Sequence, residues 1–264
     1  MARPEMASWD PDQYLKFSEE RTQPCRDLAA RVSVPNVHHV IDLGCGPGNS
    51  TQVLADRWPD AEITGVDSAA EMINTAIQTH PRGRWIVGDI VKWAGEEEQQ
   101  FDIVFSNAAI QWLPDHASLY PKLFARVASD GALAIQIPSS FDRPAHRLLR
   151  EMAASLGWRK WFPTGRVKNW HSHDSGFYYD LAAPLASRVE LWETEYIHVM
   201  PNAEAVVEWY KGTGMRAYLQ AIEDETERDR FIAEYLEKIH AAYPPRADGR
   251  ILFPFLRIFL IAYR

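Results

Sequence analysis

Short apolar runs alternate with helical patterns through the first half of the chain. Strands are predicted at residues 40–43, 61–67, 85–90, 101–107 and 131–137, where β-branched and other apolar residues cluster. Between them apolar residues recur at helical spacing, for example Val53, Leu54 and Trp58 after the first strand. Such alternation predicts an α/β fold with a parallel sheet and helices on both faces.

The alternation changes after Pro138. Helices are predicted at 144–157, 175–185 and 202–243, the last interrupted near residue 224, and strands at 189–199 and 251–262. The sheet is therefore expected to have seven, mostly parallel strands. The segment between the last two strands is far longer than a hairpin needs, which predicts a helical lid over the carboxyl ends of the strands, where open α/β sheets bind ligands.

A glycine-rich turn follows the first predicted strand. Gly44, Gly46 and Gly48 stand at alternate positions, directly after Asp42 and before a predicted helix. Glycine lets the backbone adopt a positive φ and approach a ligand, and a helix N-terminus favours a negatively charged group. The dinucleotide fingerprint needs a glycine where Asn49 stands, and the sequence has no P-loop. The turn resembles the first motif of class I S-adenosylmethionine methyltransferases, which implies that Asp42, Gly44 and Gly46 bind that cofactor, the two glycines at its methionine end; a turn without a cofactor is the alternative.

The next strands also end in polar residues that suit a nucleoside. Asp67 is expected to accept hydrogen bonds from both ribose hydroxyls. Asp89 and Ile90 are expected to bracket the adenine, and Met72 to pack on its face, although a core methionine is an equal alternative. Asn107 ends the fourth strand and is expected at the same site. Each acid taken singly has a helix cap as its alternative.

Two further expectations concern helices near this turn. Ser68 with Glu71 predicts a capping box at the start of the helix after the second strand. Before the first strand, helices are predicted at 11–17 and 24–32. Arg21 is expected to pair with the methionine carboxylate of the cofactor, the alternative being a surface arginine paired with Glu20 or Asp27.

Composition narrows the class of substrate. The 264 residues carry a net charge of −8 without a Lys/Arg run, which argues against nucleic acid and for a small molecule. The two cysteines, Cys25 and Cys45, indicate no disulfide framework and a reducing cytoplasm. No zinc-type spacing occurs, and His171 with His173 is expected in an exposed loop. Neither a signal peptide nor a membrane span is indicated.

Four segments are similar to the trans-aconitate methyltransferases. They are Trp9-Asp-Pro-Asp-Gln-Tyr14 with its continuation to Pro24, the glycine turn from Asp42 to Thr51, Asn107-Ala-Ala-Ile-Gln-Trp-Leu-Pro-Asp-His116, and Thr213-Gly-Met-Arg216. The likeness covers nearly the whole chain. It implies a Rossmann-like class I fold and transfer of a methyl group from S-adenosylmethionine to one carboxylate of trans-aconitate, with a monomethyl ester and S-adenosylhomocysteine as products. By role, 1–35 is a helical segment over the cofactor, 36–140 the cofactor-binding core, and 141–264 strands six and seven with the lid.

The reaction needs alignment more than acid–base chemistry, because a carboxylate is already anionic at pH 7. Gln111 and Trp112 are therefore expected to position the reactants rather than to act as acid or base. The acceptor site is expected between the ends of strands four and five and residues 196–216, with Tyr178, His198, Trp209, Arg216 and Arg257 as candidates. Arg216 has an exposed helix residue as its alternative, and Arg257 has exposure to solvent. A different carboxylic acid as substrate, or cofactor binding without turnover, stays open, and the oligomeric state is not predicted.

Overall fold

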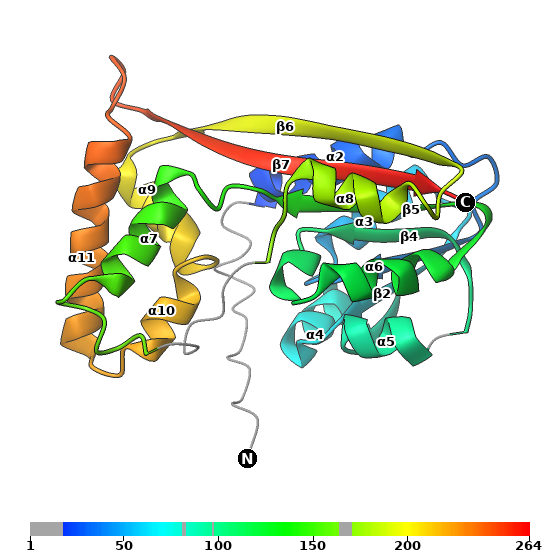
Figure 1. Cartoon of the computed structure of the whole chain (residues 1–264), viewed down its shortest axis with the longest axis horizontal. Coiled ribbons are helices and arrows are strands. Elements are labelled where there is room, and N and C mark those ends of the chain that lie inside the picture. The colour runs from blue at the N-terminus through cyan, green and yellow to red at the C-terminus, as the bar shows by residue number, and fades with distance from the viewer. Residues whose placement is uncertain (1–17, 81–82, 97, 164–170) are drawn as a thin grey trace. The chain divides into compact units, whose positions relative to one another are not determined.

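The computed structural model describes residues 18–80, 83–96, 98–163 and 171–264 (Figure 1). The helix predicted at 11–17 lies outside them. The strands follow the order β3-β2-β1-β4-β5-β7-β6 in one seven-stranded sheet. Their bounds are β1 His39–Leu43, β2 Glu62–Asp67, β3 Arg84–Val87, β4 Phe101–Asn107, β5 Val127–Pro138, β6 Arg188–Met200 and β7 Ile251–Tyr263.

The helices among these residues match most of the predicted ones. Their bounds are α2 Ser18–Arg31, α3 Asn49–Arg57, α4 Ala70–Thr79, α5 Ile90–Glu96, α6 His116–Ala125, α7 Pro144–Ala154, α8 Ser175–Ala182, α9 Ala203–Lys211, α10 Arg216–Ala221 and α11 Glu225–Ala242, with a 3-10 turn η1 at Ile110–Trp112. In the part of the chain that the structure covers, none of these helices combines the length and apolarity needed to cross a membrane.

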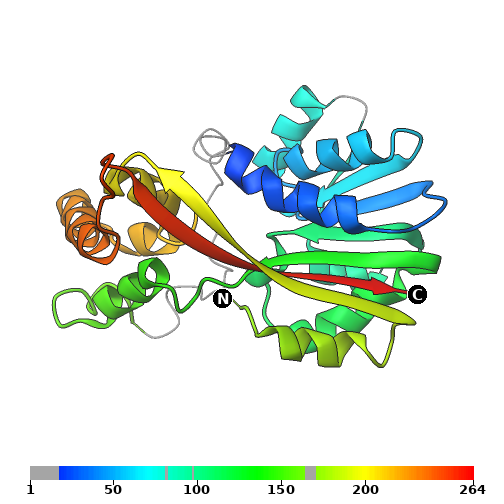
Figure 2. The ribbon, with the colours of Figure 1, turned by 90° about the horizontal axis from the view of Figure 1, so that it is seen from above.

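Strand pairing explains how helices come to cover both faces of the sheet. The pairs β1–β2, β2–β3, β1–β4 and β4–β5 are parallel, and β5–β7 is antiparallel. The chain steps from β1 to β3 in one direction and from β3 to β5 in the other. Right-handed crossovers therefore place α3 and α4 on one face and α5 and α6 on the opposite face. Figure 2 shows α2 on the face of α3, and α8 on the face of α6.

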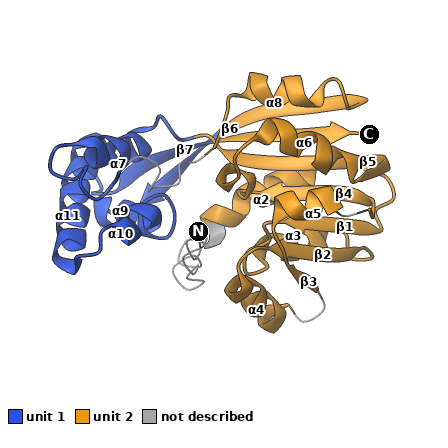
Figure 3. Ribbon diagram, turned by 60° about the horizontal axis from the view of Figure 1, so that its bottom comes forward, with its two compact units in different colours: residues 1–7, 140–170, 195–256 blue, residues 8–139, 171–194, 257–264 orange. Residues whose placement is uncertain are grey.

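Two compact units divide the chain (Figure 3). Of the described residues, unit 2 contains 18–139, His171–Thr194 and Arg257–Arg264, and unit 1 contains 140–163 and Glu195–Leu256. The strands β6 and β7 contribute residues to both. Unit 2 holds the first five strands, α2 to α6 and α8, whereas unit 1 holds α7, α9, α10 and α11. The helical lid predicted from the sequence stays a prediction.

Each unit has its own apolar interior. In unit 2 one face of the sheet, with Ile41, Val104, Leu133 and Ile258, packs against α5, α6 and α8. In unit 1 aromatic rings dominate: the rings of Trp158 and Phe231 meet edge to face at 4.9 Å between centroids. The Tyr235 hydroxyl donates to the Ala145 carbonyl at 3.0 Å, which joins α11 to α7.

Two local predictions were wrong at their boundaries, and a third was confirmed. Helix α2 begins at Ser18 and contains Pro24 in its interior, whereas the sequence predicted a helix that begins at Pro24. Strand β3 ends at Val87, so Asp89 and Ile90 belong to the start of α5. The interruption predicted near residue 224 is confirmed, because Asp224 is the N-cap of α11, and a second break at residues 212–215 precedes α10.

Candidate functional site

The glycine turn between β1 and α3 contains two glycines with different surroundings. Gly44 has φ +76°, and a Cβ built on it would lie 2.2 Å from the Cβ of Ala109. Gly46 has φ +55°, and a Cβ there would meet no heavy atom within 4 Å. Both conformations favour glycine. Gly44 is thus needed for packing within the protein, whereas Gly46 leaves a space that no described protein atom fills.

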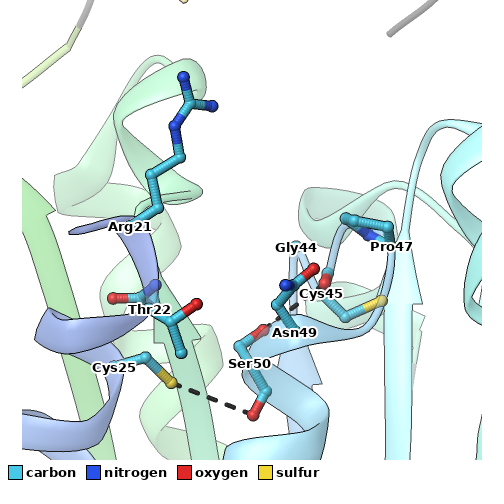
Figure 4. Close-up of a pocket in the computed structure, with 9 residues that line it drawn as sticks. Arg21, Thr22, Cys25, Gly44, Cys45, Pro47, Asn49 and Ser50 are labelled. Atoms are coloured by element: carbon cyan, nitrogen blue, oxygen red, sulfur yellow. Dashed lines mark hydrogen bonds between the residues drawn. The ribbon is translucent and has the colours of Figure 1, made fainter. Parts of the chain in front are cut away.

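A pocket lies between this turn and helix α2 (Figure 4). Its volume is about 360 Å³, part of it open to solvent. One wall is α2, and the other is the turn with the start of α3 and the end of β4. The lining residues are Arg21, Thr22, Cys25, Gly44, Cys45, Pro47, Asn49, Ser50 and Asn107. Arg21 and Asn107, both predicted cofactor ligands, are among them.

Asp42 lies beneath the turn and is fully buried. One carboxylate oxygen, Oδ2, accepts hydrogen bonds from the hydroxyls of Ser50 at 2.6 Å and Thr51 at 2.7 Å. The carboxylate therefore ties the end of β1 to the first turn of α3. Burial raises the pKa of Asp42 to about 6, against the lowering effect of those two hydroxyls. Asp42 thus lies under the glycine turn, and its direct contact with the cofactor stays a prediction.

This raised pKa predicts a pH dependence of stability that Asp42→Asn removes. An acid whose folded pKa exceeds its unfolded value binds a proton more readily in the native state, so it stabilises the fold as the pH falls. Between pH 7 and pH 4, without cofactor, the wild type is expected to gain about 2 kcal/mol relative to Asp42→Asn, because the folded carboxyl takes up its proton over this range while the unfolded one is still partly ionised at pH 4. Urea unfolding of both proteins measures the free energy of unfolding at each pH. A difference between the two proteins that stays constant from pH 7 to pH 4 would contradict the prediction.

Asp67 ends β2 and holds the turn from the other side. Its Oδ2 accepts from the Gly46 amide at 2.9 Å and its Oδ1 from the Ala69 amide at 2.9 Å. The capping box predicted from Ser68 and Glu71 is wrong, because the N-cap position is Ala69 and makes no side-chain cap. Burial raises the pKa of Asp67. Each carboxylate oxygen can accept two hydrogen bonds, so Asp67 has capacity left for the ribose, and that contact remains a prediction.

Asp67→Ala is expected to weaken binding of S-adenosylhomocysteine, used as a non-reacting probe, by about 1.5–3 kcal/mol, because a charge-assisted contact to the ribose is lost. Asp224→Ala is the matched control, since Asp224 accepts one backbone hydrogen bond as the N-cap of α11. Calorimetric titration should show a roughly 10- to 150-fold higher Kd for the first variant, about 1.4 kcal/mol per factor of ten, and no change for the second. Equal affinities would remove the ribose assignment.

The residues predicted to surround adenine lie in three different settings. Asp89 is exposed, and its Oδ1 accepts from the Lys92 amide at 3.0 Å, which caps α5. Ile90 and Met72 are 8% and 3% exposed and belong to the apolar interior. Ile90 also lies beside Gly44, since its Cδ1 is 3.7 Å from the Cβ position there. Asp89 thus caps a helix and Met72 is a core residue, which are the alternatives that the sequence left open. Their contact with adenine stays a prediction.

The segment after β4 is held in a fixed turn. Ala108 has φ +53°, an uncommon value for alanine. The Gln111 side chain, 2% exposed, donates to the Ala108 carbonyl at 2.6 Å, and the Gln111 carbonyl accepts from the His171 amide at 2.8 Å. Gln111 therefore fixes the backbone next to Asn107, and its expected role in positioning the reactants stays a prediction. Trp112 is half-buried at the end of η1.

Tyr178 lies in the interior of unit 2. It is 1% exposed, and its hydroxyl is 2.8 Å from Nδ1 of His116, whose Nε2 is 2.8 Å from the Ile110 carbonyl. This arrangement favours a structural role for Tyr178 over contact with a substrate. His116 was not predicted as its partner, because the pair is separated by 62 positions. Of the two histidines predicted in an exposed loop, His173 is exposed and His171 is half-buried.

Arg257 does not face solvent. It is 3% exposed on β7, and its Nη1 donates to Oε1 of Gln136 at 3.1 Å. The alternative of an exposed strand residue is therefore wrong, and Gln136 is a polar residue absent from the predicted site. The sequence indicates Gln136 only weakly as a site residue, since it is one glutamine in the apolar run from Ala132 to Ile137.

The remaining acceptor candidates belong to unit 1. His198 on β6 is 7% exposed, with its ring centroid 5.1 Å from that of Trp209, which is 2% exposed on α9. Arg216 is half-buried and begins α10, after the turn predicted at Thr213 and Gly214. His198 and Trp209 thus lie together, and an acceptor site that draws on both units stays a prediction.

The pocket in unit 2 fits S-adenosylmethionine. Arg21 lines the pocket and supplies a positive charge that suits the carboxylate of the cofactor. Gly46 leaves open a space that a side chain would occupy. Asp67 is an acid at the end of the neighbouring strand β2. In open α/β sheets such ligands bind at the carboxyl ends of the strands. These residues come from α2, the turn and β2, all within unit 2.

Comparisons with known proteins identify a methyltransferase domain and the fold. Residues 40–131 match the family model for a methyltransferase domain. The fold is similar to Haemonchus contortus phosphoethanolamine N-methyltransferase 2 in complex with S-adenosyl-L-methionine (16% identity, TM-score 0.52, 91% of this chain and 52% of that one). It is also similar to coclaurine N-methyltransferase bound to N-methylheliamine and S-adenosylhomocysteine (12% identity, TM-score 0.51, 98% and 75%). At these identities the likeness shows the fold alone.

Curated relatives match over nearly the full length of the chain. A trans-aconitate 2-methyltransferase of Azoarcus sp. (strain BH72) is 48% identical over 263 residues, which cover 98% of this chain and 100% of the relative. Proteins of the same name from Rhodopseudomonas palustris (strain BisB5) and Yersinia pestis (strain Pestoides F) are 42% and 41% identical, each over 98% of this chain and 100% or 99% of the relative. The chain therefore belongs to the trans-aconitate 2-methyltransferase family of class I S-adenosylmethionine-dependent methyltransferases.

Proposed function

We propose that this protein transfers the methyl group of S-adenosylmethionine to one carboxylate of trans-aconitate, giving a monomethyl ester. The observation that carries the proposal is the extent of the identity to proteins of that name. It spans 98% of the chain and so includes unit 1, all of which lies outside the methyltransferase domain model at residues 40–131. The cofactor pocket alone would suit any member of the class.

The residues of unit 2 hold the cofactor. When bound, S-adenosylmethionine supplies an electrophilic methyl group on a sulfonium. Gly46 gives it space, Asp67 accepts from its ribose, and Arg21 meets its carboxylate; Asp42 secures the turn from below through Ser50 and Thr51. Asp89, Ile90, Met72 and Asn107 are proposed around the adenine and the rest of the pocket.

The protein accelerates this reaction by alignment and exclusion of water. The acceptor carboxylate is already the nucleophile at pH 7, so no general base is required. Gln111 holds the backbone at the end of β4, next to the pocket, and Trp112 follows it. A fixed orientation of the two reactants and a dry site lower the barrier without proton transfer.

The other carboxylates of the acceptor need cationic and donor side chains. Arg216 and Arg257 are proposed as those cations, with His198 and Trp209 of unit 1 as further contacts. Arginine suits this task because its planar guanidinium can bind a carboxylate through two parallel hydrogen bonds. The free, buried cysteines Cys25 and Cys45 fit the cytoplasm that we propose as the location.

Transfer of label from methyl-tritiated S-adenosylmethionine tests the proposal. Trans-aconitate, cis-aconitate, isocitrate and citrate are offered separately, and the ester product is identified by mass spectrometry. We expect trans-aconitate to be the best acceptor. Efficient labelling of another carboxylic acid instead would contradict the assignment of trans-aconitate as the substrate. Tight cofactor binding without labelling of any acid would identify a binding protein that does not catalyse transfer.

A further inference from the structure

A row of polar side chains crosses the sheet of unit 2 beside the cofactor pocket. Asn107, which lines the pocket, pairs with Gln136 in the β4–β5 register, and Pro138 pairs with Arg257 in the β5–β7 register. Paired residues of adjacent strands, and residues two apart along a strand, have side chains on the same face. Asn107, Gln136 and Arg257 therefore share one face at the carboxyl ends of β4 and β5.

Gln136 is an unusual residue for this position. It is 0% exposed, and its Oε1 accepts from Arg257 at 3.1 Å. Its Nε2, also buried, has no hydrogen-bond partner among the described residues, and neither has Oδ1 of Asn107. A buried donor left without a partner destabilises the fold, because the hydrogen bond that it made with water is lost and not replaced. A valine or leucine would pack here without that cost, which points to a role for the amide.

The orientation of the Gln136 amide suits an incoming anion. Because Oε1 faces the guanidinium of Arg257, the amide presents its donor, Nε2, on the other side. A guanidinium and an amide N–H form a set of donors, and a carboxylate is the acceptor that matches such a set. The register places Gln136 directly opposite Asn107 and so next to the cofactor pocket.

We propose that Gln136 is a specificity-determining residue, which orients Arg257 and binds, together with it, an acceptor carboxylate that is not methylated. This inference rests on the proposed function and names a subsite of it. Since the two residues lie on the sheet that also carries the cofactor turn, the spacing between the bound carboxylate and the methyl donor is a property of unit 2 alone.

Two substitutions of Gln136 separate this role from a structural one. Gln136→Glu keeps an acceptor for Arg257 but replaces the amide donor by a negative charge, which neutralises Arg257 and repels a carboxylate. Gln136→Met has a similar volume, leaves Arg257 charged and removes both functions of the amide. Gln100→Glu, an exposed residue before the amino end of β4, is the charge-matched control.

The KM for trans-aconitate is expected to rise about 30-fold in Gln136→Glu and about 5-fold in Gln136→Met, with kcat within a few-fold of wild type, because a carboxylate away from the reacting centre binds equally in the ground and transition states. The Kd of S-adenosylhomocysteine by calorimetry is expected to stay unchanged in both, and Gln100→Glu to match wild type throughout.

Two results would overturn the inference. One is an unchanged KM in Gln136→Glu. The other is a loss of cofactor affinity in both variants that parallels the rise in KM, which would mark a structural role. The wild type in the same assay reports separately on the proposed function, since a wild type that does not methylate trans-aconitate refutes that function whatever the ratio between variants.

Discussion

Valine in place of Gly46 is expected to abolish cofactor binding in a protein that still folds. A Cβ at this position meets no described protein atom within 4 Å, so the side chain would project into the space that we assign to the methionine end of S-adenosylmethionine. The Kd of S-adenosylhomocysteine is expected to rise on the order of 100-fold or more, which corresponds to about 2.7 kcal/mol or more. Calorimetric titration measures it, and methyl transfer should be lost in parallel.

The strain of a positive φ needs its own control, because an L-residue in the left-handed region costs about 1–2 kcal/mol wherever it stands. Gly249 offers the match: it has φ +80°, and a Cβ there likewise meets nothing within 4 Å. Gly249→Val should lose comparable thermal stability and keep full cofactor affinity. Normal affinity in Gly46→Val would show that the turn is not the cofactor cradle.

Arg216→Ala is expected to lower kcat/KM for trans-aconitate by about 30- to 1000-fold, from the loss of a bidentate contact worth about 2–4 kcal/mol. Arg216 is half-buried at the start of α10, where the turn at residues 212–215 sets its direction. Arg216→Lys keeps the charge without the planar fork and should give an intermediate loss. Steady-state kinetics with trans-aconitate, and with citrate as a competing acid, provides the measurement.

Arg246→Ala is the control for a lost arginine in the same unit, since Arg246 is exposed in the turn before β7. Its kinetics should match those of the wild type. If Arg216→Ala left the constants for every polycarboxylate unchanged, Arg216 would be removed from the acceptor site, and the dependence on S-adenosylmethionine would stand.

The sequence predicted the elements that rest on local patterns. Strand β4, from Phe101 to Asn107, has the predicted bounds, and the strand-to-helix turn at Gly44 and Gly46 lies where the glycines indicated. The position of Arg21 at the pocket followed from helical spacing and a plausible fold of the N-terminal segment. In each case, a few neighbouring residues carry the whole signal.

What the sequence missed depends on partners outside the local pattern. The helix N-cap at Ala69 has no capping side chain, and Asp67, two residues earlier, accepts its amide hydrogen. Pro24 is tolerated inside α2, where the adjacent Cys25 and Leu28 are fully buried and tertiary packing outweighs propensity. Gln136 meets Arg257 across 121 positions, and Tyr178 meets His116 across 62. No periodicity within one segment reports such pairs.

The two glycines of the cofactor turn are exposed to different selection. A side chain at Gly44 would overlap Ala109, so mutations there are expected to destabilise the fold itself. A mutation at Gly46 is expected to leave a protein that still folds, with the space for the ligand closed. Duplicated copies of this gene are thus expected to lose catalysis first at Gly46, and to survive as intact proteins available for another use.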